Sequence, residues 1–292
     1  MTQKFGRNYS FSVQGTSGDV HVFEPPFTID FDITRNSLTS ANVAQFRLYN
    51  LSKKVRDDIR QNISDSLSYL PIQFLGGYGD ALAPLFTGSV SQAWSVREGV
   101  NFVTQIESFD GGFAMVNGQL NDTTLNPQPA GTPVINVLGN IAATLEPYHV
   151  TVGKIDWNFV ETIKRDTTFN GNTWDVLREI GGNAIFIDHG KFYALQDNST
   201  VNNVTDILTI NADTGLLETP VRERTVIRVK MLLEPNLQIG QSVFLESLTA
   251  TNLTNTYKVM AVKHHGTISD AVCGEAITEA ELLVLGDFSE IT

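Results

Sequence analysis

The strongest constraint on this fold is a strict alternation of apolar and polar residues over Phe27–Thr34, FTIDFDIT. Alternation of this kind is typical of a strand with one buried and one solvated face. A polar stretch from Arg35 to Ser40 follows, rich in turn formers. A second alternating run then places apolar residues at Val43, Phe46, Leu48 and Leu51. Ser52 is a good N-cap for a helix over 53–62, so the pattern predicts a strand pair closed by a short helix.

Short strand patterns separated by glycine-rich turns occupy both ends of the chain. In the first part they cover 9–13, 20–23, 71–75, 85–94 and 100–109. In the last part they cover 224–233, 242–245 and 257–262, and 276–285 fits either a strand or a helix. Strands at this spacing favour a barrel or a sandwich.

The middle of the chain reads differently, as alternating helix and strand pieces. Thr132 as N-cap and Pro133 at the first helical position open an apolar stripe that Pro147 ends. A short strand is expected at 149–152, a second helix around Trp174–Ile180, and a hairpin over 184–195 that turns at Asp188-His189-Gly190. We therefore predict an α+β, mainly β chain. Two related β-barrel domains, 1–116 and 201–292, flank a linker and small α/β insert at 117–200.

Composition limits the compartment and the partners. The chain has 292 residues and one cysteine, Cys273, so an internal disulfide is excluded. It shows no secretory signal pattern and no apolar run near the ~20 residues of a membrane-spanning helix. These features predict synthesis and assembly in a reducing cytoplasm. The net charge of −12 disfavours a nucleic-acid clamp and suits a surface past which DNA slides, although solubility alone also explains it.

No motif for catalysis or metal binding is present. The five histidines form no HExxH or spaced metal-ligand set, and the adjacent His264 and His265 would point to opposite faces of a strand. Carboxylates for glycoside hydrolysis are available without any pairing pattern, at Asp30, Asp32, Asp57, Asp58, Asp188 and Glu107. No Gly-x-Ser-x-Gly elbow exists, Cys273 has no catalytic signature, and Gly76–Gly79 lacks the Lys-Ser/Thr of a phosphate loop. We predict no catalytic residue, cofactor or metal, and no enzyme.

Three groups of residues resemble baseplate hub proteins of bacteriophage tails. The first is the strand Ile29–Ile33 followed by NVAQFRLYNLS, which contributes Asn42, Ala44, Phe46, Tyr49, Asn50, Leu51 and Ser52. The second is Gly131-Thr132-Pro133 and then Thr168-Phe169-Asn170-Gly171. The third is Leu232–Pro235, Gly240–Val243, Tyr257–Val259 and His265-Gly266. One departure is Val272-Cys273, where such hubs often carry a tryptophan after the His-Gly turn.

The resemblance implies a structural protein of the virion tail baseplate, assembled in the bacterial host cytoplasm. Such hubs form homotrimers in which two tube-like barrels per chain make a pseudo-sixfold ring. That ring joins the tail tube protein above to the central spike protein below, contacts surrounding baseplate wedge proteins and lets DNA pass without specific binding. Three copies would carry three times −12, or −36, and part of this charge would line the lumen. Asp30 and Asp32 are candidates to face either the lumen or a neighbouring copy.

Two functions of other classes remain open on the sequence alone. One is a tail-associated cell-wall hydrolase, which release of peptidoglycan fragments by the purified protein would reveal. The other is a host-glycan-binding module, which binding to a glycan array would reveal. The missing catalytic signature counts against the first.

Overall fold

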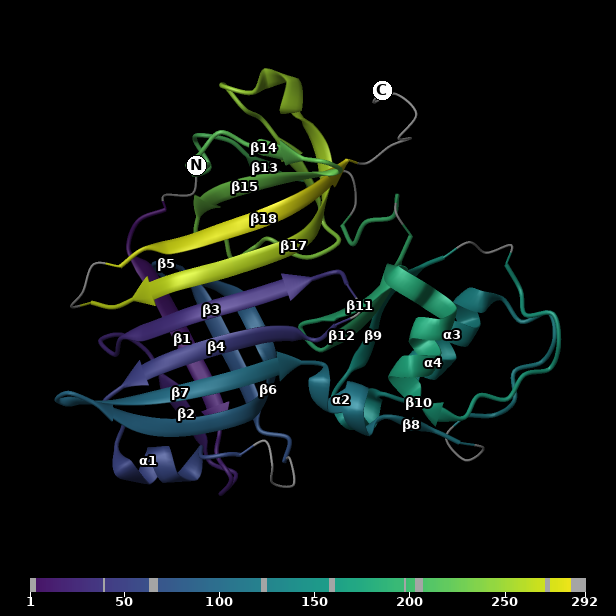
Figure 1. Cartoon of the computed structure of the whole chain (residues 1–292), viewed down its shortest axis with the longest axis horizontal. Coiled ribbons are helices and arrows are strands. Elements are labelled where there is room, and N and C mark those ends of the chain that lie inside the picture. Colours follow the sequence, from purple (N-terminus) through teal and green to yellow (C-terminus); the bar gives the residue numbers. More distant parts are fainter. Residues whose placement is uncertain are drawn as a thin grey trace.

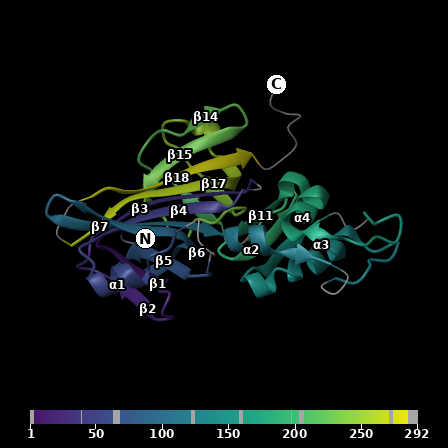
Figure 2. The ribbon, with the colours of Figure 1, turned by 60° about the horizontal axis from the view of Figure 1, so that its bottom comes forward.

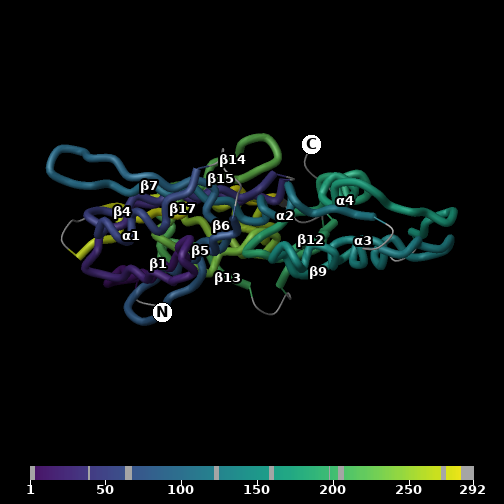
Figure 3. Tube along the Cα trace, turned by 90° about the horizontal axis from the view of Figure 1, so that it is seen from below, coloured from purple at the N-terminus to yellow at the C-terminus, as the bar shows by residue number. Residues whose placement is uncertain are grey.

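The computed structural model describes residues 4–38, 40–62, 68–121, 125–157, 161–196, 198–202, 207–270 and 274–284. A large β-sheet region lies beside a smaller region that contains the helices α3 (Val134–Ala143) and α4 (Thr173–Gly181) (Figure 1). Seen from below, the molecule is elongated, with the helical region at one end (Figure 3).

One sheet of thirteen described strands contains strands from both ends of the chain. The first part supplies β1 (Arg7–Gln14), β2 (Val20–Phe23), β3 (Ile29–Asn36), β4 (Asn42–Tyr49), β5 (Pro71–Tyr78), β6 (Ala81–Glu98) and β7 (Asn101–Asp110). The last part supplies β13 (Leu208–Ile210), β14 (Val221–Glu223), β15 (Val226–Leu232), β16 (Ser242–Leu245), β17 (Asn255–Ile268) and β18 (Ala276–Val284). The order is β14-β15-β18-β17-β3-β4-β7-β6-β5-β1-β2, with β16 paired to β13 and β17. The two parts therefore join where β17 runs antiparallel to β3.

The predicted mainly β fold with a few helices is confirmed. The segment from Ala276, which fitted a strand or a helix, is the strand β18. The pairings among the described strands leave the sheet open from β14 to β2, so closure into two barrels stays a prediction. None of the described helices is long and apolar enough to cross a membrane.

The insert combines a three-stranded sheet with helices that cover it (Figure 2). The helix α2 (Gly112–Asn117) connects β7 to the insert, whose remaining strands are β8 (Gln119–Leu120), β9 (Thr151–Asp156), β10 (Gly171–Asn172), β11 (Ile185–Asp188) and β12 (Lys191–Leu195). Short 3-10 turns lie at Glu146–Tyr148 and Gly182–Ala184 in the insert, and at Thr251–Leu253 between β16 and β17 in the last part. Two sequence-based expectations here were wrong. Pro133, not Thr132, is the N-cap of α3, and β9 begins at Thr151 because His149 has a left-handed φ of 66° in the preceding turn.

The phase of β3 and β4 decides which residues enter the core. In β3 the predicted apolar face is confirmed at Ile29, Phe31 and Ile33. In β4 the buried side chains are Asn42, Ala44, Phe46 and Leu48, whereas Val43 is 39% exposed. The expectation that Val43 shares a face with Phe46 was wrong, because residues three apart in a strand point to opposite faces.

The helix α1 (Lys53–Asp58) follows the strand pair as predicted, and it is shorter than expected. The Ser52 hydroxyl accepts a hydrogen bond from the backbone N–H of Val55, which confirms the N-cap. Ile59 at the C-cap is buried and Val55 packs against the same core, while Ile63 lies outside the described residues.

The described residues form four hydrophobic clusters, the smallest of which joins Phe186 and Leu195 of the insert to Ile239 of the last part. The first contains the aromatic side chains of the first part, among them Phe11, Phe46 and Phe74. The second lies within the insert, around Trp174, and the third lies within the last part, around Met231. Three residues of the last part pack into the first cluster: Leu233, Ile268 and Ala276. The two β-rich parts thus share core contacts as well as the sheet.

Candidate functional site

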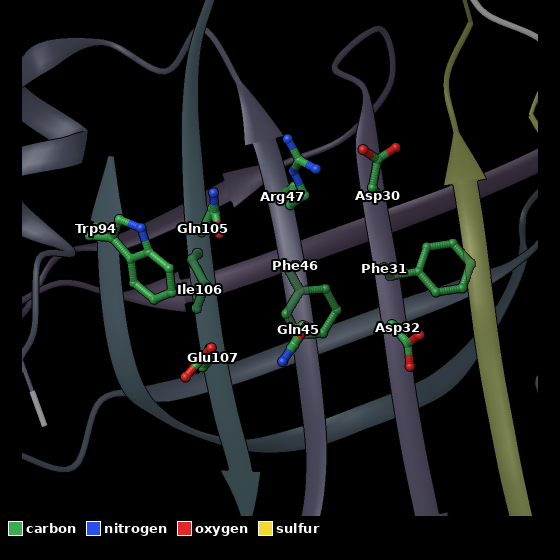
Figure 4. Close-up of a pocket in the computed structure, with 10 residues that line it drawn as sticks. All are labelled: Asp30, Phe31, Asp32, Gln45, Phe46, Arg47, Trp94, Gln105, Ile106 and Glu107. Atoms are coloured by element: carbon green, nitrogen blue, oxygen red, sulfur yellow. The ribbon is translucent and has the colours of Figure 1, made fainter. Parts of the chain in front are cut away.

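A polar face covers the outer side of β3, β4, β7 and β6, where ten residues line a shallow groove of about 210 Å³ (Figure 4). The side chains of Phe31, Phe46 and Ile106 belong to the core beneath the groove, and the other seven lie on the outer face. Cross-strand register places these residues in two rows. One row contains Asp32, Gln45 and Glu107, and the other contains Asp30, Arg47, Gln105 and Trp94. They share one face because each occupies the outward phase of its strand.

The two aspartates of β3 are held by donors from neighbouring strands. Asp30 accepts hydrogen bonds from the hydroxyls of Tyr49 and Thr267, at 2.5 and 2.7 Å. Burial, followed by the Asp30 hydrogen bond, raises the pKa of Tyr49 to about 12, so Tyr49 stays a donor at neutral pH. The Asp32 carboxylate lies 3.0 Å from the Lys263 ammonium. Both carboxylates therefore have polar partners on neighbouring strands.

The polar face continues without interruption across β17, β18 and β15. Its residues there pair across strands: Lys263, His265, Glu279, Glu281, Arg228 and Lys230. Arg228 contacts both Glu223 and Glu281, and His265 Nε2 lies 3.2 Å from Glu279. Exposed pairs of this kind add about 0–1 kcal/mol each to stability. They therefore make the face charged but contribute little to the stability of the fold.

A second polar group is buried where the insert meets both β-rich parts. We call it the junction cluster; it contains Arg35, Asn42, Asp110, Asp188, His189 and His264. Its members come from β3, β4, β7, β17 and the hairpin that joins β11 to β12. All except His189 are at most 4% exposed.

Arg35 is the centre of the junction cluster. Its Nη1 lies 3.3 and 3.2 Å from the two carboxylate oxygens of Asp188 and donates to Nε2 of His189 at 2.6 Å. Its Nη2 donates to the carbonyl of Leu237 at 2.8 Å and to Nε2 of His264 at 3.2 Å. One guanidinium thus contacts the insert and the last part of the chain from a strand of the first part.

The remaining hydrogen bonds extend this network. Because Nε2 of His264 accepts from Arg35, its Nδ1 carries the proton and donates to the Thr278 hydroxyl at 2.8 Å. Asn42 donates to the carbonyl of Ile187 at 2.9 Å, which ties β4 to the insert hairpin. The Asp110 carboxylate accepts from the backbone N–H of Gly190 at 2.9 Å, in the turn of that hairpin.

Burial sets the protonation states in the junction cluster. Burial, followed by the nearby Asp188 carboxylate, raises the pKa of Asp110 to about 7. Burial and then the Arg35 charge lower the pKa of His189 to about 4. The same two causes hold the pKa of His264 well below its usual value. At neutral pH both histidines are therefore neutral and accept from Arg35.

Replacing Asp110 with asparagine should change how stability depends on pH. The folded Asp110 keeps its proton up to about pH 7, whereas the unfolded carboxyl releases it near 3.8. Between these values the folded state binds more protons, so Asp110 lowers the free energy of unfolding as the pH rises. We expect Asp110→Asn to gain stability relative to the wild type from pH 4 to 7, by about 1.4 kcal/mol or more. Urea unfolding across this range measures the difference.

Two features make that comparison specific. His189 and His264 act in the opposite direction, since they are neutral when folded, but they are present in both proteins and cancel in the difference. Asp80→Asn, at an exposed turn, is the matched control and should leave the pH profile unchanged. Parallel profiles for Asp110→Asn and the wild type would contradict the raised pKa.

The residues that carry the family resemblance take several structural positions. Ala44, Phe46, Leu51 and Pro235 are buried, Asn42 belongs to the junction cluster, and Tyr49 and His265 lie on the polar face. Turns account for most of the others: Asn50, Gly171, Gly240 and Gly266 have φ angles of 57°, 106°, 76° and 144°. At Gly266 a Cβ would lie 2.0 Å from the carbonyl oxygen of Glu275, so the close approach of β18 requires glycine. Cys273 lies outside the described residues.

The sequence did not predict the junction cluster. Arg35 was placed in a turn, yet it is the last inward residue of β3 and is fully buried. The one available signal was its phase, because residues 29, 31, 33 and 35 share a strand face. The carboxylates considered for hydrolysis are dispersed: Asp30, Asp32 and Glu107 on the polar face, Asp188 in the junction cluster, Asp57 exposed on α1 and Asp58 beside His21. No group of three or more metal-ligating side chains among the described residues is placed to hold a metal ion.

Comparison with known proteins gives a family and a fold. A family model described as "Baseplate hub gp41" matches residues 10–271. A tail protein from Neisseria meningitidis MC58 is similar at a TM-score of 0.60 and 11% identity, over 96% of this chain and 97% of that one. The 43 kDa tail protein of prophage MuSo2 from Shewanella oneidensis has a TM-score of 0.60 at 8% identity, over 94% and 96%.

A third similar structure comes from a secretion system. It is an E. coli protein described as a component of the type VI secretion system with structural similarity to T4 bacteriophage tail proteins gp27 and gp5. Its TM-score is 0.59 at 8% identity, and the match covers 90% of this chain and 75% of that one. No curated protein sequence matches the chain. At these identities the structural likeness establishes the fold, and the family model establishes the family.

Proposed function

The chain belongs to the baseplate hub gp41 family, and from this premise we propose that three copies form a pseudo-sixfold ring in the tail baseplate of a phage. The ring joins the tail tube to the central spike and lets DNA pass, with wedge proteins around it. The family is one of baseplate hubs, and the similar structures are phage tail proteins and a secretion-system component that resembles them, which fits a structural role without enzymatic activity. Assembly takes place in the host cytoplasm and the product is part of the virion.

The observation that carries this proposal is the polar face that crosses both β-rich parts within one sheet. A sheet buries one face in its core, and here the other face presents charge from β6 to β15 with no layer of the described chain over it (Figure 1). A wall that DNA passes needs such a surface, polar and without a cationic clamp. In this proposal Asp30 and Asp32 face the lumen rather than a neighbouring copy.

The proposed ring also divides the chain into functional parts. Residues 1–116 and 201–292 build the wall as two tube-like domains, and 117–200 form a linker and insert that projects from it. The separate hydrophobic clusters of the insert and of the last part support this division. The junction cluster then fixes the insert to both wall-building parts through Arg35.

The state of assembly tests the proposal. Native mass spectrometry of the purified protein, alone and with its tube and spike proteins, should give a trimer. Negative-stain electron microscopy should show a ring with a central hole. A monomer under all of these conditions would overturn the proposed function.

The lumen assignment predicts an effect on DNA passage. Asp32→Asn with Glu107→Gln removes two negative charges from one row of the polar face. Loss of repulsion should let DNA adhere to the wall, so we expect slower DNA ejection from phage that carry the double variant. A fluorescent-dye ejection assay measures the rate. Asp80→Asn with Glu179→Gln, at exposed positions off this face, removes the same charge and should leave the rate unchanged; equal rates in both variants would refute the assignment.

A further inference from the structure

The large sheet contains the same four-strand arrangement twice. The first unit is β3-β4-β7-β6, and the second unit is β14-β15-β18-β17. Each unit consists of two hairpins, β3–β4 with β6–β7 in one and β14–β15 with β17–β18 in the other. In both units the second strands of the two hairpins pair in the middle and the first strands form the edges. The two units are therefore topological repeats.

A bulge at the same place fixes the alignment of the two units residue by residue. In β6 the extra residue is Ser91, between Val90 and Gln92 opposite β7. In β17 it is Met260, between Val259 and Ala261 opposite β18. Matching the two bulges makes Gln92 equivalent to Ala261, and the equivalence of the other residues in these strands follows from this offset.

The hydrogen bonds between side chains support this alignment. It makes Ser95 equivalent to His264, and Thr104 equivalent to Thr278. Ser95 hydrogen-bonds to Thr104 across β6 and β7 at 2.9 Å, and His264 donates to Thr278 across β17 and β18 at 2.8 Å. Both threonines are buried. A cross-strand hydrogen bond between side chains, with a buried threonine as one partner, thus recurs at the matching position.

The two units meet within the chain at one seam. There the edge strand β17 of the second unit pairs antiparallel with the edge strand β3 of the first unit over eight residue pairs, from Ala261–Asn36 to Ile268–Ile29. The opposite outer strands of the units are β6 and β14. These are the repeats of the two strands that form the seam. Residues 81–89 of β6 pair with β5 and Ala93 pairs with Gln61, so among the described strands only the end of β6 from Ser95 has an open side, whereas β14 ends the sheet.

From this repetition, and resting on the proposed function, we propose that β6 of one copy pairs with β14 of the next copy in the register of the β17–β3 seam. His265 faces Asp32 in the seam. The bulge alignment makes Val96 equivalent to His265 and Glu107 equivalent to Glu281. Glu107 leads across the strands through Gln45 to Asp32, and Glu281 leads through Arg228 to Val221, so Val221 is equivalent to Asp32. Val96 therefore lies opposite the partner's Val221. One residue earlier, Ser95 lies opposite the partner's Arg222. Each copy then pairs its β6 with one neighbour and its β14 with the other, which is the head-to-tail contact that closes rings.

The backbone groups at both edges point in the direction that this pairing needs. Ala93 exchanges both backbone hydrogen bonds with Gln61, so by alternation the N–H and C=O of Ser95 face the same open edge. On the other edge, Lys230 accepts from the N–H of Leu217, which orients Lys230 and Arg228 toward β14. Arg222 lies opposite Ile227, so its backbone groups point away from β15. Ser95 and the partner's Arg222 thus form a hydrogen-bonded pair.

The side chains at the two edges also complement each other. Val221 is 54% exposed and Val96 is half-buried, although both are β-branched apolar residues on the polar face. An unpaired strand edge that carries apolar side chains can pair with another chain. The proposed register covers each valine with the other, where the seam within the chain has a histidine and an aspartate. Gln61 already pairs with Ala93, so the contact begins at Ser95 and extends toward Glu98.

Disulfide cross-linking tests the register directly. In a Cys273→Ser background, Val96→Cys and Val221→Cys would occupy a non-hydrogen-bonded antiparallel pair, whose separation suits a disulfide. After mild oxidation the double variant should run as covalent dimer and trimer on a non-reducing gel. Each single variant should stay monomeric, and a mixture of the two single variants should give dimer only. The mixture shows that the bond joins two copies.

The register control is Arg97→Cys with Val221→Cys. A shift of one residue turns the side chain to the other face of the strand, so we expect little cross-linking. A trimer in native mass spectrometry that cross-links through the Arg97 pair, or through neither pair, overturns this inference and leaves the ring intact. A protein that stays monomeric with its tube and spike proteins overturns the proposed function and this contact with it.

Discussion

Replacing Arg35 with methionine is expected to lower the free energy of unfolding by about 3–5 kcal/mol. Methionine keeps much of the side-chain volume but removes the charge that faces Asp188 and the donors that face His264 and Leu237. Asp188 would then be a buried carboxylate without its cationic partner. Urea unfolding of the full-length protein, followed by circular dichroism, measures the loss.

The neighbouring substitutions define what this loss means. Arg228→Met removes an arginine with two carboxylate partners on the exposed polar face, and it should cost only about 0–1 kcal/mol. Arg35→Met combined with Asp188→Asn should recover part of the loss, because no uncompensated charge remains. Equal effects of Arg35→Met and Arg228→Met would show that the junction cluster does not hold the insert.

Phe46→Ala is expected to cost about 3–5 kcal/mol through the cavity it leaves in the first hydrophobic cluster. The Phe46 ring packs edge-on against Phe11 and Phe74, with centroids 4.9 and 5.3 Å away, and Phe86 lies 6.1 Å away. Four rings from four strands meet here, so the surroundings cannot collapse into the space without moving the sheet. Urea unfolding again gives the free energy.

Val43→Ala on the same strand is the control for Phe46→Ala. Val43 is 39% exposed and points to the opposite face, so its truncation should stay within about 0.5 kcal/mol. A large loss at Val43 with a small one at Phe46 would mean that β4 is placed one residue out of phase. The pair of variants thus measures the register as well as the packing.

The sequence predicted local elements well where one face of a strand carries only apolar residues. Ile29, Phe31 and Ile33 specify both the strand and its buried face, and Ser52 specifies the start of α1. The phase of β4 was harder, because its inward positions include Asn42 and Ala44 while the outward Val43 is apolar. Here tertiary context overrides the pattern, since Asn42 is satisfied by the carbonyl of Ile187.

The junction cluster could not be predicted because its partners are distant in sequence. Arg35 meets Asp188 across 153 positions and His264 across 229. A charged residue in an apolar phase indicates a buried partner, but it does not say which carboxylate supplies it. The residues that carry the family resemblance lie at a cap, in turns, in the core, in the junction cluster and on the polar face, and the family is confirmed. The repeat of the four-strand unit was not visible as sequence similarity, since it is expressed in pairing order and in a shared bulge.

The seam between β17 and β3 has a consequence for biosynthesis. Thr267 on β17 contacts Asp30 on β3, and the two residues are 237 positions apart. At a synthesis rate of about 5–20 residues per second, β17 is synthesised roughly 12–47 s after β3. During that time one edge of β3 has no partner strand. Charged side chains on an unpaired strand disfavour its pairing with another chain, so Asp30 and Asp32 suit a strand that is exposed for this long.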